Sequence, residues 1–158
     1  MKKNEKMIEI LNDLIRVNID RVSGYEKASH PAKGTDPGAR NIFYKMAMES
    51  RSYINELHAE VLHMGGAPVE KNTISGKIYL FWLDLKASFN GIDTQSLLVA
   101  SEFGEQAIQK IYDKTLETAV DLPYKLVSMI RDQKMAMKRA YELVKRYRDS
   151  VIINVHHN

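Results

Sequence analysis

The sequence predicts an all-α fold, an antiparallel four-helix bundle with one long crossover between its second and third helices. Four long segments carry apolar residues at three- and four-residue steps, which is the period of a helix with one buried face. The prolines, which disfavour helix interiors, fall between these segments, at positions 31, 37, 68 and 123. No segment alternates with the two-residue period of a strand.

The first helix is expected at residues 4–29, where Leu11, Leu14, Asn18 and Tyr25 share one face. It ends before Pro31, because a residue that precedes proline avoids the helical conformation. The second helix is expected from Pro37 to Met64. Asp36 is placed to cap its first turn, and Gly65-Gly66 to end it.

A connection from residue 65 to 91 is too long for a tight turn, and residues 77–87 predict a short helix within it. The third helix is expected at 93–119 and the fourth from about 123 to 149. Short loops join the first helix to the second and the third to the fourth, and a long crossover joins the second to the third. This is the ferritin-like connectivity of a four-helix bundle. The expected domain is 1–150, with 151–158 as a C-terminal tail of no clear structure.

Composition excludes several classes of protein. The chain has 158 residues, 44% of them apolar, which is enough for one domain with a real core. It has no cysteine, so disulfides and thiolate chemistry are excluded and a reducing, cytoplasmic location is expected. No secretory signal and no apolar run of membrane-spanning length are seen.

A family resemblance extends from Leu11 to about Tyr112 and covers about two thirds of the chain. The residues that carry it are Leu11-Asn12-Asp13-Leu14-Ile15, Gly24-Tyr25-Glu26-Lys27-Ala28, Ser50-Arg51, Glu56-Leu57, Gly65-Gly66-Ala67-Pro68, Trp82-Leu83-Asp84-Leu85-Lys86 and Glu102-Phe103-Gly104-Glu105-Gln106-Ala107. They resemble the bacterial domain-of-unknown-function family 2383, which is classed with ferritin-like bundles. The resemblance implies a fold and a cytoplasmic bacterial origin, and it implies no activity. A histidine expected near Ala140-Tyr141 is missing.

A di-iron centre needs a Glu-x-x-His pair on each of two helices and a glutamate on each of the others. Glu60-Val61-Leu62-His63 is one such pair, and the candidate single carboxylates are Glu26 and either Glu102 or Glu105. In an antiparallel hairpin centred near residue 33, however, Glu26 and Glu60 are ~28 Å apart along the bundle. The fourth helix offers no histidine either, so an intact di-iron site and metal cofactors are not expected. Iron or manganese at a degenerate or mononuclear site (Glu60, His63, Glu102) is the alternative.

The same comparison of positions along the bundle axis places polar residues near the middle of the bundle: Asn18, Ser50 or Arg51, Glu105 and Gln133. A buried carboxylate must be paired, and Arg51 is the expected partner of Glu105. The cluster is interpreted as a structural network that fixes helix register. The alternative is a pocket for a small molecule or for one metal ion.

The net charge is only +3, and basic residues are interspersed with acidic ones, so nucleic acid is not the expected partner. The fourth helix does carry a basic run that could bind anions or nucleic acid: Lys134, Lys138, Arg139, Lys145, Arg146 and Arg148. Residues 78–85 are apolar on nearly all sides, which favours a homo-oligomer. The functional hypothesis is therefore a non-catalytic protein-interaction or stress-related protein. A ferritin-like metal oxidoreductase and an anion binder are the alternatives.

Overall fold

The computed structural model describes residues 2–30, 36–71 and 94–157. These residues form four helices: α1 (Lys2–Ala28), α2 (Pro37–His63), α4 (Thr94–Thr118) and α5 (Tyr124–His157). The described ranges contain no strand, so the all-α prediction is confirmed. No helix in these ranges has the length and apolar character needed to cross a membrane.

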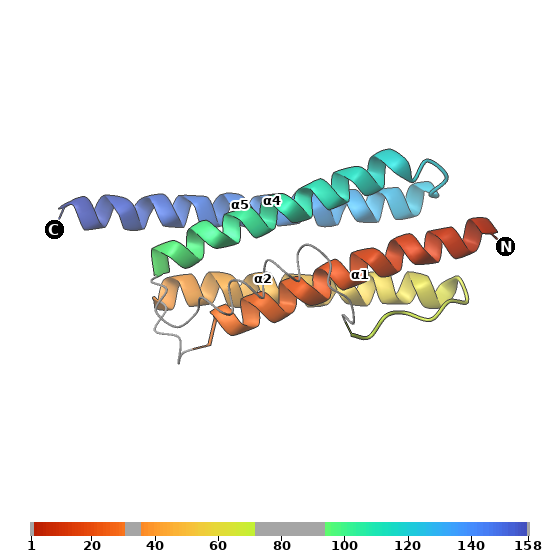
Figure 1. The fold of residues 1–158 in the computed structure, drawn as a ribbon, viewed down its shortest axis with the longest axis horizontal. Helices are drawn as coiled ribbons and strands as arrows, with labels where there is room; N and C mark the ends of the chain where they lie inside the picture. Colours follow the sequence, from red (N-terminus) through yellow and green to blue (C-terminus); the bar gives the residue numbers. More distant parts are fainter. Residues whose placement is uncertain (1, 31–35, 72–93, 158) are drawn as a thin grey trace.

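The helices are arranged as two antiparallel hairpins, α1 with α2 and α4 with α5, which lie one above the other in Figure 1. The hairpins contact each other through α1 and α4 and through α2 and α5. α2 and α4 run in the same direction, and most of the connection between them, including the path of the predicted crossover, lies outside the described residues. The short helix expected at residues 77–87 lies outside the described residues.

Both ends of α2 follow local signals in the sequence. At its start the Asp36 carboxylate accepts a hydrogen bond from the Ala39 backbone N–H at 3.1 Å, and Pro37 fills the first helical position. At its end Gly65 adopts φ 79°, a conformation that glycine reaches without strain. The bonds Gly66 N–H to Val61 C=O and Gly65 N–H to Leu62 C=O, both 2.9 Å, complete a Schellman motif.

The C-terminal end of α5 corrects the sequence prediction. The helix continues to His157, whereas residues 151–158 were expected to be a tail without structure. No glycine or proline lies between Tyr124 and His157, so no residue there stops the helix. The β-branched residues Val151, Ile152 and Ile153 lower helix propensity only slightly.

The core lies along the bundle axis and is filled from all four helices. Its fully buried side chains include Leu11, Leu14, Ile15 and Tyr25 of α1, Phe43 and Leu57 of α2, Leu98, Ile108 and Tyr112 of α4, and Ile130 and Met137 of α5. Polar side chains interrupt this core near its middle, where Asn18, Arg21, Ser50, Glu105 and Gln133 are all buried. A buried polar group is costly unless it is hydrogen-bonded, so the partners of these residues decide what the centre of the bundle can do.

Candidate functional site

Arg21 of α1 is the charged residue at the centre of the bundle, and its side chain is completely buried. Its guanidinium binds the Glu105 carboxylate of α4 in a two-point fashion, with Nε–Oε2 at 3.0 Å and Nη2–Oε1 at 2.7 Å. Glu105 is itself only 1% exposed. Two-point pairing of this kind is the strong, directional form of an ion pair, and here it joins α1 to α4.

The remaining nitrogen of the guanidinium binds α2. Arg21 Nη1 donates to Ser50 Oγ at 2.8 Å, to Glu49 Oε1 at 3.0 Å and to the Met46 carbonyl at 3.2 Å. Burial alone would lower the pKa of Arg21, but the charge and hydrogen bonds of Glu105 more than offset burial, and the pKa is raised. The guanidinium is therefore a permanent cation inside the bundle.

A chain of hydrogen bonds continues from this ion pair into the second half of the core. The Ser50 hydroxyl donates to Asn18 Oδ1 at 2.9 Å. The Asn18 amide then donates to the Tyr112 hydroxyl and to the Leu14 carbonyl, each at 2.9 Å. Because both ends of the Asn18 amide are bound, its orientation is fixed by its neighbours.

The chain ends at the bundle surface. The Tyr112 hydroxyl donates to Gln133 Oε1 at 2.8 Å, and Gln133 Nε2 donates to the exposed carboxylate of Glu56 at 3.1 Å. Burial raises the pKa of Tyr112, so its hydroxyl stays neutral and remains a donor. All bonds point the same way, from the cation Arg21 to the anion Glu56, and they connect all four helices. We call this set the polar network: Arg21, Glu105, Glu49, Ser50, Asn18, Tyr112, Gln133 and Glu56.

The structure brings Asn18, Glu105 and Gln133 into this network but leaves Arg51 out. Arg51 is half exposed and pairs with Glu26 of α1 on the outer face, so the expected Arg51–Glu105 pair is wrong. Successive residues of a helix are rotated by about 100°, and Arg51 therefore points away from the axis that Ser50 faces. The sequence prediction missed Arg21. This residue lies three positions after Asn18 and four before Tyr25, so it shares their face of the helix.

The proposed metal ligands are apart from the network and engaged elsewhere. Glu60 pairs with Lys125 at 3.1 Å, Glu102 pairs with Arg148, and His63 is exposed. Within residues 2–30, 36–71 and 94–157, no group of three or more His, Asp or Glu side chains is close enough to hold a metal ion. These candidates therefore do not form one site.

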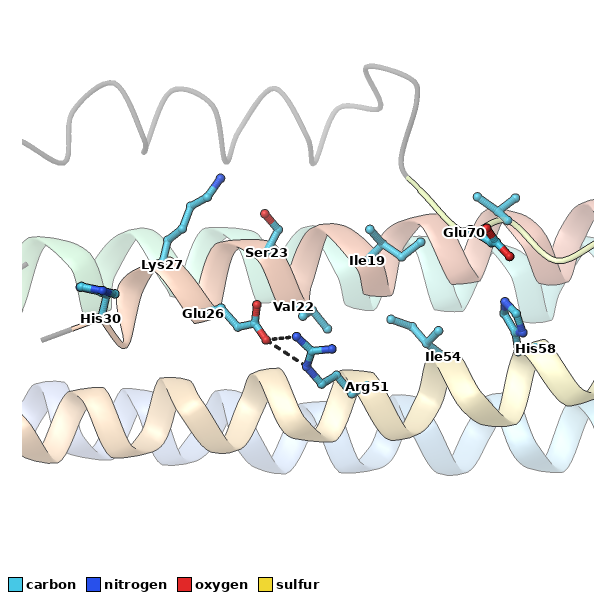
Figure 2. Close-up of a pocket in the computed structure, with 11 residues that line it drawn as sticks. Ile19, Val22, Ser23, Glu26, Lys27, His30, Arg51, Ile54, His58 and Glu70 are labelled. Carbon is cyan, nitrogen blue, oxygen red and sulfur yellow. Dashed lines mark hydrogen bonds and ion pairs between the residues drawn. The ribbon is translucent and has the colours of Figure 1, made fainter.

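A cavity of about 840 Å³ lies on the outer face of α1 and α2. Figure 2 shows the Glu26–Arg51 pair in its wall, with Ile19, Val22 and Ile54 beside it and His58 further along α2. Neither of the ion-paired side chains in its wall belongs to the polar network. Among the described residues that line the cavity, no nucleophile is seen hydrogen-bonded to a base.

Glu49 provides a pH-dependent prediction. Its pKa is raised above the ordinary value of 4.5, mainly by burial and despite the opposing charge of Arg21. A raised folded-state pKa of an acid gives a stability contribution that is present below pH 4.5 and is lost as pH rises through the folded value. Relative to the wild type, Glu49→Gln should therefore gain stability as pH rises from about 4 to 7.

Urea unfolding of both proteins at several pH values measures this difference. Glu117→Gln is the matched control, because Glu117 is exposed at the end of α4. It shows the effect of removing one exposed carboxylate at each pH. A pH dependence for Glu49→Gln no larger than that of Glu117→Gln would contradict the assignment.

One of three comparisons with known proteins finds a match. A family model described as "Domain of unknown function (DUF2383)" matches residues 6–118. No curated protein and no solved structure matches the chain. The matched range contains every member of the polar network except Gln133, together with α1, α2 and α4. Because the model covers well over half of the 158 residues, the chain belongs to the DUF2383 family.

Proposed function

We propose that this protein is a non-catalytic four-helix bundle that acts by binding other molecules, and that Arg21 supplies the positive charge at its centre. The observation that carries this proposal is the double engagement of the guanidinium, which binds both Glu105 and Glu49. In di-iron bundles the inward carboxylates bind metal cations. Here two carboxylates, those of Glu49 and Glu105, bind the guanidinium of Arg21 instead.

The donor set at the centre does not fit a metal ion. Arginine cannot be deprotonated in a protein, so a divalent cation between these carboxylates would lie against a fixed positive charge. Oxygen-activating iron sites also use imidazole beside carboxylate. His30 and His58 line the outer cavity instead, and His63 is exposed.

The proposed scaffold, cellular location and self-association also rest on the sequence. A ferritin-like scaffold in a bacterial cytoplasm agrees with the absence of cysteine and with the family match. Self-association, or a role in stress, would use apolar surface such as that expected at residues 78–85, which lie outside the described residues. The polar network then serves to hold the four helices in one register, as buried polar groups do in some helical assemblies.

Metal analysis tests the proposal. The protein is purified without chelator, and iron and manganese are measured per chain by mass spectrometry, before and after ferrous iron is added in air. We expect neither metal in stoichiometric amount and no protein-dependent oxidation of ferrous iron. A known di-iron protein carried through the same steps shows that metal is retained. Stoichiometric iron or manganese would overturn the proposal in favour of a metal oxidoreductase.

A further inference from the structure

A groove of about 320 Å³ runs between α2 and α5, on a side of the bundle that the outer cavity does not reach. Its apolar floor is made by Ile42, Met46, Ala136, Ala140 and Leu143. Its volume lies at the lower end of the range for small-molecule sites. We call it the α2–α5 groove.

Three cationic side chains line this groove: Lys45 from α2, and Arg139 and Arg146 from α5. All three are exposed, and none forms an ion pair or hydrogen bond with another described residue. Arg139 and Arg146 are seven residues apart, so their Cα atoms lie about 10 Å apart along the helix. The groove therefore presents three available cations from two helices.

The rest of the basic run on α5 is used differently. Lys134 pairs with Asp113, and Arg148 pairs with Glu102 and with Asp149, so these two charges are neutralised. The structure thus divides the basic run, which the sequence presents as one patch, into three sets. Lys134 and Arg148 are ion-paired, and Arg139 and Arg146 line the groove. Lys138 and Lys145 are exposed and belong to neither set.

Among the described residues that line the groove, Glu49 is the one carboxylate, and it also contacts Arg21 in the core. It is only 28% exposed and accepts a hydrogen bond from Arg21. The positive charge of Arg21 therefore compensates much of the negative charge of Glu49. The groove remains positive overall, with three cations against this single, partly neutralised anion. An anionic ligand would lie toward the arginines, away from Glu49.

We propose that the α2–α5 groove binds a small organic anion with an apolar body. The guanidinium groups would bind its carboxylate, sulfonate or phosphate, since a planar fork of N–H donors matches these oxyanions. The floor would receive the apolar body, because removing apolar surface from water is favourable. This inference rests on the proposed binding function, and it specifies the kind of molecule that this function would use.

The probe is 8-anilinonaphthalene-1-sulfonate, an amphipathic anion whose fluorescence rises in apolar sites. N-phenyl-1-naphthylamine, which has the same ring system without the sulfonate, is the neutral comparison. We expect saturable binding of the anion, much weaker binding of the neutral compound, and loss of affinity with added salt. Equal affinity for both probes would overturn the proposal.

Two variants locate the site. Arg139→Gln/Arg146→Gln should weaken binding of the anion by roughly tenfold, since it removes two of the three cations of the groove and exposed charge pairs each contribute only modestly. Ala136→Leu should also weaken it, because the added side chain occupies the floor. The matched control is Arg131→Gln/Lys138→Gln, which removes the same charge from exposed positions of α5 outside the groove.

Circular dichroism and a cooperative thermal transition confirm that each variant is folded. If the groove variants and the control lose affinity equally, binding follows overall charge and the groove is not the site. The metal analysis described above and the probe-binding experiment measure different properties. Either proposal can therefore be overturned without the other.

Discussion

Replacing Arg21 by methionine is expected to destabilise the fold by about 3–5 kcal/mol, the usual cost of removing one partner of a buried ion pair. The loss is large because the carboxyl group of Glu105, which is 1% exposed, would lose the cation that compensates it. Ser50 and Glu49 would lose a donor in the same step. Urea unfolding followed by circular dichroism measures the change in the free energy of unfolding.

Two further variants separate burial from pairing. Arg51→Met breaks the Glu26 pair, whose side chains are 50% and 44% exposed, and should cost less than about 1 kcal/mol. Arg21→Met/Glu105→Leu removes both charges and should recover a large part of the stability lost in Arg21→Met. A similar cost for Arg21→Met and Arg51→Met would show that the Arg21–Glu105 pair is not held inside the bundle.

Replacing Tyr112 by phenylalanine is expected to cost about 1–3 kcal/mol, the cost of leaving buried polar groups without a partner. The substitution removes only the hydroxyl, which accepts from Asn18 and donates to Gln133. Gln133 Oε1 would then lose its buried donor, and one N–H of the Asn18 amide would have no acceptor. Thermal and urea unfolding report the loss.

Tyr141→Phe is the matched control, because the Tyr141 hydroxyl accepts only an exposed hydrogen bond from Gln106. It should change stability by less than about 0.5 kcal/mol. Combining Tyr112→Phe with Gln133→Leu should cost less than the sum of the two single changes, since both break the same bond. Additive costs would mean that Tyr112 and Gln133 do not interact.

The sequence predicts the helices well because their signals are local. Asp36-Pro37 and Gly65-Gly66 mark the two ends of α2 through capping and backbone conformation, and neither depends on the rest of the fold. The end of α5 has no such signal. The helix therefore continues to His157, past Asp149, where the sequence predicts its end.

The candidate site was harder to predict because it depends on which helix face each residue occupies. The level of each residue along the axis was sufficient to bring Asn18, Glu105 and Gln133 together. Choosing between Arg21 and Arg51 required their rotation about the helix axis, which an apolar pattern does not give for a charged residue. A rule that charged residues lie outside would exclude Arg21, and the strong pair with Glu105 is what overrides that rule here.

The direction of the hydrogen bonds in the polar network has a consequence for proton movement. Two of its links are the carboxamides of Asn18 and Gln133, which donate N–H bonds but have no proton that they exchange as an acid would. A proton taken up by Glu56 at the surface therefore cannot be passed along this chain to Glu105. The network therefore joins the surface to the centre mechanically without providing a path for protons between them.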